Sequence, residues 1–162
     1  MNKSRFTIDH VRIESDRPFE EVVKAFERLL GKFDPDVAKA LIAAGDVEQA
    51  RAKIAAMAGS SSFMLFGTQD HGALLRLAGR KCKAIQYVLG NPLFALQKTQ
   101  HDIRASLYAP LRVLIYENEV GRTSIEYDKP SSLFGQFGNS EIDASAALLD
   151  RRLESLIAAA SE

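Results

Sequence analysis

The chain has 162 residues, of which 46% are hydrophobic and 26% charged, and its 21 basic residues balance its 21 acidic residues. This length suits a single domain over residues 1–162 that buries roughly 70% of the surface exposed by the unfolded chain. The zero net charge argues against nucleic acid and anionic membrane surfaces as partners, because no overall field attracts a polyanion.

The chain is predicted to begin with a strand and a long amphipathic helix. Residues 6–14 are rich in β-branched side chains, which is typical of a strand. Apolar residues then recur every three or four positions across residues 19–33, so they form one stripe on a helix. Asp16 and Pro18 supply the start signal for this helix.

Two short alanine-rich helices are predicted within residues 35–58. Asp34 precedes a proline and is a candidate N-cap for the first, and Asp46 with Gln49 resembles a capping box for the second. Gly45 and Gly59 end them, and a serine-rich loop follows.

The second half of the chain is predicted to be rich in strands. Short apolar or alternating runs are separated by turn residues, and the last two runs join around Val120 and Gly121 as a β-hairpin. Pro130 ends the last strand. The predicted strands lie at residues 63–67, 83–89, 111–119 and 122–128.

Three further helices are predicted in this half. A turn and a brief helix occupy residues 69–79, and a second short helix follows Pro92 over residues 92–100. An apolar stripe from Ile142 to Ile157 predicts a long final helix, opened by a capping box of Ser140 and Asp143.

This order of elements predicts an α+β fold. The five strands favour an antiparallel sheet, and the long N- and C-terminal helices are its natural cover on one face. The predicted order is strand, helix, four strands, helix, with residues 35–58 as an extra helical segment.

Three motifs resemble the family known as domain of unknown function 302. They are Gly90-Asn91-Pro92 after a strand, the strand at residues 109–114, and Tyr127-Asp128-Lys129-Pro130 at the end of a strand. Asp70 matches an aspartate-containing turn of the family, and the resemblance covers residues 63–132. The resemblance implies a fold like that of the TATA-binding protein, whose order of strands and helices agrees with the predicted one. It implies no particular reaction. A shared fold also gives no reason to expect DNA binding.

The Gly90-Asn91-Pro92 break interrupts an apolar stretch and is a candidate binding element. Asn91 has an amide suited to meeting a ligand at the end of the strand. The structural alternative is a turn, in which Gly90 supplies an unusual backbone angle, Asn91 caps the next helix and Pro92 fixes its first turn. Because each residue type has a local conformational role, we favour the turn.

Asp70 and His71 form an adjacent carboxylate and imidazole on a turn. They suit general acid–base chemistry, and His71 suits an axial haem ligand. The alternative is that Asp70 caps the following short helix. His10 and His101 lie far away in the sequence, so no spacing typical of a metal site is present and no metal is expected.

Cys82 is the sole cysteine, so no intramolecular disulfide can form. Its basic neighbours Arg80, Lys81 and Lys83 favour the thiolate, which would suit a redox or sulfur-transfer role. The alternative is a small apolar residue, since no resolving cysteine exists.

Arg112 interrupts an apolar strand and is expected on the same face as Leu114 and Tyr116. It either faces solvent or pairs with Glu126 or Asp128 across the hairpin, and in a pocket it would bind an anion. Tyrosines on or near these strands, including Tyr116 and Tyr127, suit either a ligand cavity or the edge of a core.

Together these patterns favour a small-molecule-binding or interaction module without strong catalytic machinery. We expect its pocket near Asp70-His71, Gly90-Asn91 and Arg112, and the expected ligand is a small apolar or anionic molecule, with haem as one option. The alternative functions are an enzyme or a redox or sulfur-handling protein using His71 or Cys82, and a haem protein with His71 as ligand. No signal-peptide or membrane-spanning pattern is present, so a cytoplasmic location is expected. The apolar stripes and strand edges favour a homodimer.

Overall fold

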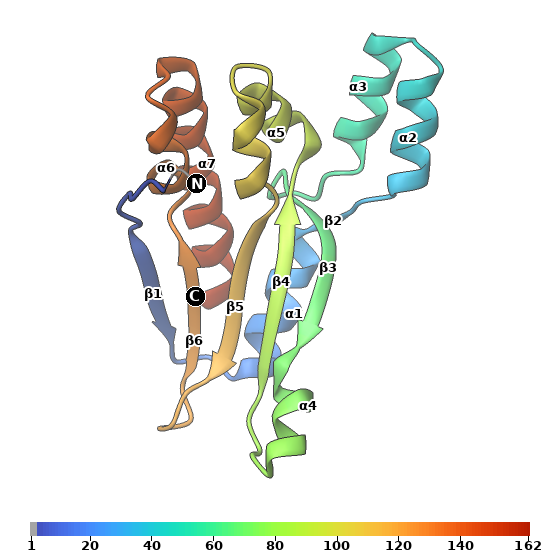
Figure 1. Cartoon of the computed structure of the whole chain (residues 1–162). Coiled ribbons are helices and arrows are strands. Elements are labelled where there is room, and N and C mark those ends of the chain that lie inside the picture. The colour runs from blue at the N-terminus through green and yellow to red at the C-terminus, as the bar shows by residue number, and fades with distance from the viewer. Residues whose placement is uncertain (1–2) are drawn as a thin grey trace.

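The computed structural model describes residues 3–162 and shows an α+β fold, as the sequence predicts (Figure 1). The strands are β1 (His10–Ser15), β2 (Gly31–Lys32), β3 (Met64–Asp70), β4 (Ala84–Gly90), β5 (Leu111–Glu117) and β6 (Thr123–Asp128). The helices are α1 (Phe19–Leu29), α2 (Pro35–Ala43), α3 (Val47–Ala56), α4 (His71–Leu75), α5 (Pro92–Thr99), α6 (Pro130–Phe134) and α7 (Ser140–Ser161). Short 3-10 turns follow α4, α5 and α6.

The sheet has six strands in the order β1-β6-β5-β4-β3-β2, and it is mixed. The prediction of five antiparallel strands is wrong at one edge, where β2 pairs parallel to β3 with Gly31 opposite Met64. The other neighbouring strands are antiparallel. Because β2 has two residues directly after a helix, it offers no alternating pattern that sequence reasoning could detect.

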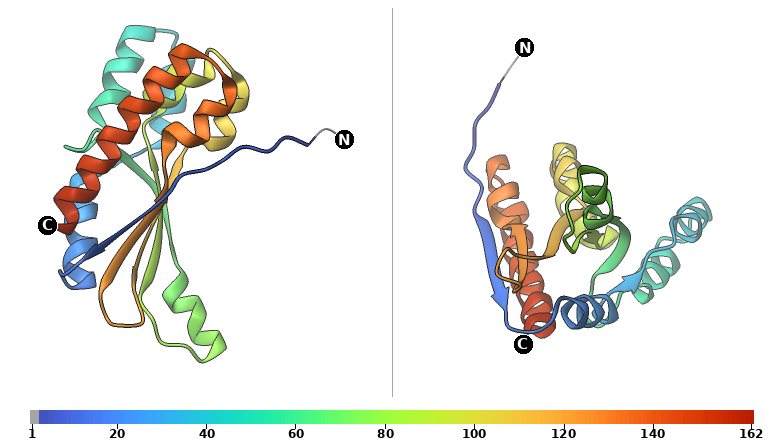
Figure 2. Two further views of the ribbon diagram at one scale, coloured as in Figure 1. Left: turned by 90° about the vertical axis from the view of Figure 1, so that its left-hand side faces the viewer. Right: turned by 90° about the horizontal axis from the view of Figure 1, so that it is seen from below.

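Helices α1 and α7 cover one face of the sheet, as predicted (Figure 2). Each turns an apolar stripe inward, since residues three or four apart share a helix face. The main core therefore lies between these helices and the inner face of β4, β5 and β6. Fully buried core residues include Val22, Phe26, Tyr87, Val113, Ile115, Ile125, Leu153 and Ile157.

Helix α1 is shorter than predicted, and α7 is capped differently. Pro18 is the N-cap of α1, with no side-chain bond, and the helix ends at Leu29 rather than at residue 33. Asn139 caps α7 by accepting from the backbone N–H groups of Glu141 and Ile142, so the predicted Ser140 box is wrong.

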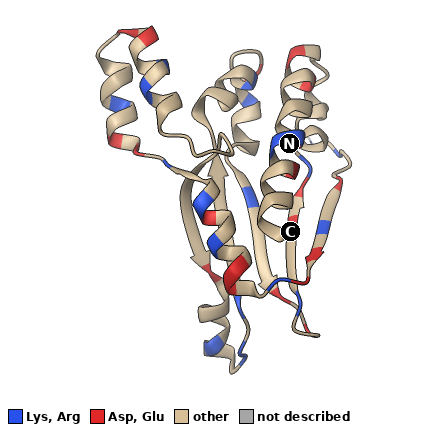
Figure 3. Cartoon of the chain, turned by 180° about the vertical axis from the view of Figure 1, so that it is seen from behind, with Lys and Arg blue, Asp and Glu red and all other residues tan. Residues whose placement is uncertain are grey.

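In Figure 3 acidic and basic positions alternate along α1 and are spread over the other helices.

The α2–α3 pair extends beyond the end of the sheet (Figure 1). Asp34 and Asp46 cap these helices, as predicted. Gly31 and Gly59 lie side by side before and after this pair, and the backbone N–H of each donates to the carbonyl oxygen of Phe63, at 2.8 and 3.0 Å. A Cβ on either glycine would overlap backbone atoms of the other segment, so both positions need glycine. None of the described helices is long and apolar enough to span a membrane.

Candidate functional site

Strand β4 ends at Gly90, and helix α5 begins two residues later. The backbone of Gly90 has no positive φ, so the predicted unusual angle is wrong. A Cβ at this position would lie 3.3 Å from Phe66 Cε2 and 3.5 Å from Pro110 Cβ, so a larger residue would push the Phe66 ring aside. Pro92 is the first residue of α5, as the turn interpretation predicts.

Asn91 is buried and uses both ends of its side chain within the fold. Its Oδ1 accepts a 2.9 Å hydrogen bond from the backbone N–H of Leu93, which caps α5. Its Nδ2 donates a 2.9 Å bond to the carbonyl oxygen of Ser62, a non-glycine residue with a φ of 69°. The side chain therefore holds the serine loop against α5 rather than offering its amide to a ligand.

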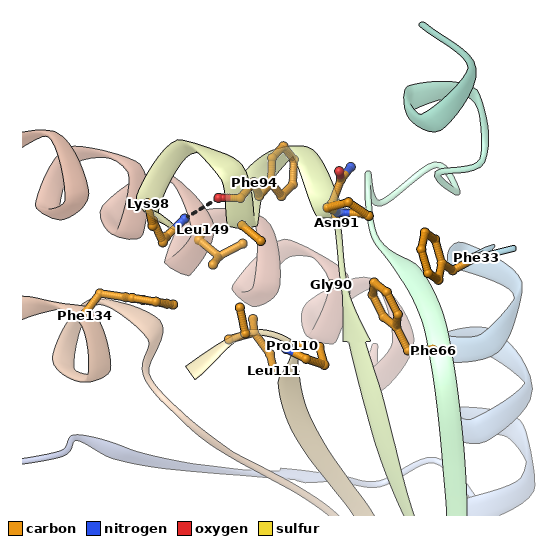
Figure 4. Close-up of a pocket in the computed structure, with 13 residues that line it drawn as sticks. Phe33, Phe66, Gly90, Asn91, Phe94, Lys98, Pro110, Leu111, Phe134 and Leu149 are labelled. Atoms are coloured by element: carbon orange, nitrogen blue, oxygen red, sulfur yellow. Dashed lines mark hydrogen bonds between the residues drawn. The ribbon is translucent and has the colours of Figure 1, made fainter. Parts of the chain in front are cut away.

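Above this turn lies an apolar cavity of about 280 Å³ (Figure 4). It sits where the end of β4 and the start of β5 meet α5, α6 and α7, and we call it the Gly90 cavity. Its lining residues are Phe33, Phe66, Gly90, Asn91, Pro92, Phe94, Ala95, Lys98, Ala109, Pro110, Leu111, Phe134 and Leu149. Apolar cavities of about 150 Å³ already bind benzene, so this one has room for a substituted ring.

Lys98 brings a buried amine to the wall of the Gly90 cavity. Its side chain is 1% exposed, and Nζ donates to the carbonyl oxygen of Phe94 at 3.1 Å and to Ser145 Oγ at 2.9 Å. The ring centroid of Phe134 lies 5.2 Å from Nζ. Figure 4 shows the side chain folded back along α5 toward Phe94.

Burial shifts the Lys98 amine toward its neutral form, whereas the Phe134 ring and the charge of Asp150 favour the charged form. Burial lowers the pKa of its amine to about 8, and the negative field of Asp150 opposes this shift. No carboxylate lies within 4.0 Å of the amine among residues 3–162. Both bonded acceptors are uncharged, so neither holds a proton on the nitrogen as a carboxylate would.

A second hollow of about 770 Å³ lies at the opposite end of β4, beside α4 and the β5–β6 turn. We call it the His71 groove, because the structure brings His71, Cys82 and Tyr116 to its wall. Its other lining residues are Arg12, Glu14, Leu75, Arg80, Lys83, Ala84, Gln86, Leu114, Glu117, Asn118, Glu119 and Val120. It is therefore more polar than the Gly90 cavity.

Asp70 acts as the helix cap that the structural alternative predicts. Its Oδ1 accepts a 2.8 Å hydrogen bond from the backbone N–H of Ala73 in α4. The backbone around Cys82 lies against the start of α4, since a Cβ on Gly72 would overlap the carbonyl oxygen of Cys82. No cluster of three metal-ligating side chains occurs in the described part of the chain.

Arg112 lies between the two hollows and lines neither. It is exposed, and no ion pair to Glu126 or Asp128 forms within residues 3–162. It alternates with buried neighbours on β5, so it shares the outer face with Leu114 and Tyr116, as predicted. Tyr127, by contrast, is 4% exposed and belongs to the main core.

Tyr116 belongs to a polar network on the outer face of the sheet. Its hydroxyl donates a 2.6 Å hydrogen bond to Glu126, and His10 lies 3.2 Å from the same carboxylate and 2.9 Å from Asp128. Hydrogen bonds to Asp128 and Glu126 raise the pKa of His10. These contacts tie β1 to β6 and lie at the surface.

Comparisons with known proteins place the chain in a family. The sequence matches the family described as "Domain of unknown function DUF302" over residues 37–160, which is most of the chain. The chain belongs to the DUF302 family. A crystal structure of an uncharacterized conserved DUF302 protein from Bacillus stearothermophilus is similar, with a TM-score of 0.65 and 15% sequence identity. The match covers 93% of this chain and 97% of that one. No curated protein matches the sequence.

Three of the DUF302 motifs lie at or near the Gly90 cavity, whereas the aspartate-containing turn at Asp70 lies at the other end of the sheet. Gly90-Asn91-Pro92 and Ala109-Pro110-Leu111 line it directly. The Asp128-Lys129-Pro130 motif leads into α6, whose Phe134 forms another wall. Asp150 of α7 orients this short helix by accepting a 2.8 Å bond from the backbone N–H of Ser131.

Sequence reasoning about this DUF302 chain missed Lys98 and grouped into one pocket residues that lie at two ends of the sheet. A lysine near the end of a short helix suggests a solvated side chain. One signal was available: Lys98 lies four residues after Phe94 and therefore on the same face of α5. The predicted pocket residues lie at two ends of the sheet, with Gly90 and Asn91 at one end and Asp70 and His71 at the other.

Proposed function

We propose that this DUF302 protein is a small-molecule-binding module whose ligand occupies the Gly90 cavity. The observation that carries the proposal is the buried amine of Lys98 in a mainly apolar wall. Ligand pockets are typically apolar with a few placed polar groups that fix orientation. The ligand class is a small apolar molecule with one acceptor group, which the amine meets.

The four phenylalanines in the lining favour a flat apolar body. Phe33 and Phe66 pack with ring centroids 4.6 Å apart at one side, and Phe94 and Phe134 line the cavity as well. Aromatic walls attract rings through offset and edge-to-face contacts. Benzyl alcohol is therefore a suitable probe, because it joins an aromatic ring to one hydroxyl.

Titration calorimetry with benzyl alcohol tests the proposal. We expect heat of binding to the wild type and a raised melting temperature, since a ligand that binds only the folded state stabilises it. Gly90→Ala narrows the cavity between Phe66 and Pro110 and is expected to weaken binding about fivefold or more, roughly 1 kcal/mol.

Two variants serve as matched controls for Gly90→Ala. Gly67→Ala adds the same methyl group to β3, where a Cβ meets nothing within 4 Å, and should leave the affinity unchanged. Cys82→Ala alters the His71 groove at the far end of β4 and should also bind as the wild type does. Absence of binding to the wild type, or equal losses in Gly90→Ala and Gly67→Ala, would contradict the proposal.

A further inference from the structure

The nitrogen of Lys98 can take part in three hydrogen bonds, and two of these three positions are filled by acceptors in the fold. The carbonyl oxygen of Phe94 and Ser145 Oγ take two of these positions. Ser145 in turn donates to Gln97 Oε1 at 3.1 Å, which leaves its oxygen free to accept from the lysine. The third position has no hydrogen-bond partner within residues 3–162, so the neutral amine satisfies its contacts while keeping a free lone pair.

A free lone pair on a buried lysine is a nucleophile. Desolvation in an apolar pocket is the way in which lysines are activated for attack on carbonyl carbon. The ring of Phe134, which lines the Gly90 cavity, lies 5.2 Å from Nζ. Because Lys98 and Phe134 both line the cavity, a carbonyl group held there lies beside the lysine side chain.

We infer that Lys98 captures small apolar aldehydes covalently, as an imine formed inside the Gly90 cavity. This inference rests on the proposed binding of small molecules there and names their class. An aldehyde fits better than a carboxylate, because the lining holds no arginine and no second cation.

The reaction balances without an oxidant or a reductant. The nitrogen lone pair attacks the carbonyl carbon and forms a C–N bond, and the carbonyl oxygen takes up a proton. The C–O bond then breaks, and the oxygen leaves as water with the two hydrogens of the original amine. One amine and one aldehyde give one imine and one water.

Reductive trapping with benzaldehyde and cyanoborohydride, followed by peptide mass spectrometry, tests the inference. At about pH 7.5 we expect Lys98 to be modified at least about tenfold faster than exposed lysines, because an exposed amine keeps its proton until about pH 10. Lys83 is the matched comparison, since hydrogen bonds to Glu20 and Glu117 raise the pKa of its amine.

Variants and competition locate the reaction. Lys98→Met keeps a linear apolar side chain and should lose the fast modification, whereas Lys83→Met should retain it. If Lys98→Met does not fold, the wild type still decides: modification of Lys98 should rise with pH around 8 and should slow when benzyl alcohol is added.

Each contrary result has a distinct meaning. Stabilisation by benzyl alcohol with modification spread over exposed lysines and none on Lys98 would overturn the inference and leave cavity binding intact. Modification of Lys98 that benzyl alcohol does not slow would also overturn it, because capture would then occur outside the occupied cavity. Failure of the proposed function shows separately, as the absence of benzyl alcohol binding to the wild type.

Discussion

Lys98 and Asn91 are both buried polar residues at the Gly90 cavity, but they have different roles. The amide of Asn91 is engaged at both ends by the backbone of Leu93 and Ser62, so it stabilises the turn. The amine of Lys98 bonds two neutral acceptors and, in the part of the chain that the structure describes, has no carboxylate within ion-pair distance. Placing a charge on this amine inside an apolar wall costs free energy. The neutral amine is therefore the form that is available to interact with a ligand.

The low pKa of Lys98 predicts a specific dependence of stability on pH. The folded chain releases this proton at about pH 8, whereas the unfolded chain keeps it up to the ordinary lysine value of 10.5. In that window the unfolded state binds more protons, so the free energy of unfolding rises with pH. Asp150, whose field favours the charged amine, makes the rise smaller.

Urea unfolding of the wild type and Lys98→Met at several pH values measures this effect. Between about pH 8 and about pH 10 the wild type should gain about 2 kcal/mol relative to the variant. Burial raises the pKa of Tyr87, which lowers stability at high pH, but this contribution is common to both proteins. Parallel pH profiles would contradict a neutral Lys98 in the folded state.

The sequence predicts the residues of the turn better than the amine beside it. Asn91 and Pro92 have strong local preferences for a helix start, so their roles follow from residue type alone. For Gly90 the sequence predicts the wrong reason, because the close approach to Pro110 arises between strands that are far apart in the chain. Lys98 is buried by α6 and α7, which lie more than thirty residues later in the chain, and such packing leaves little trace in local sequence.

The α2–α3 pair is joined to the sheet through one narrow crossing. Gly31 and Gly59 stand close together there, and the β2 strand that begins at Gly31 pairs parallel to β3. The caps predict the two short helices, whereas β2 forms because the crossing brings two backbone segments together. The crossing also places Phe33, which follows β2, against Phe66 at the Gly90 cavity.

Gly59→Ala tests the role of this crossing. The added Cβ would overlap the carbonyl oxygen of Leu29 and the backbone of Gly31, neither of which can rotate away. We expect a loss of about 3 kcal/mol in the free energy of unfolding, measured by urea denaturation. Gly135→Ala is the control, because its Cβ meets nothing within 4 Å; equal stability of the two variants would show that the crossing is loose.

The whole molecule presents an apolar cavity at one end of the sheet and a polar groove at the other. The sequence predicts the α+β class and the cover by α1 and α7, because periodicity and caps are local properties. It groups His71 with Asn91 in one pocket, although they lie at opposite ends of β3 and β4. Antiparallel register decides which strand ends meet, and the β-bulge between Leu65 and Gly67 is not visible in the sequence.

The central claim is that the Gly90 cavity is the place where a small molecule binds. Nuclear magnetic resonance with benzyl alcohol and isotopically labelled protein tests it most directly, because backbone amides report the location of the ligand. We predict that the largest shifts fall on Phe94, Leu111 and Phe134 and are reduced in Gly90→Ala. Shifts centred on His71 and Cys82, or no saturable shifts at all, would contradict the account.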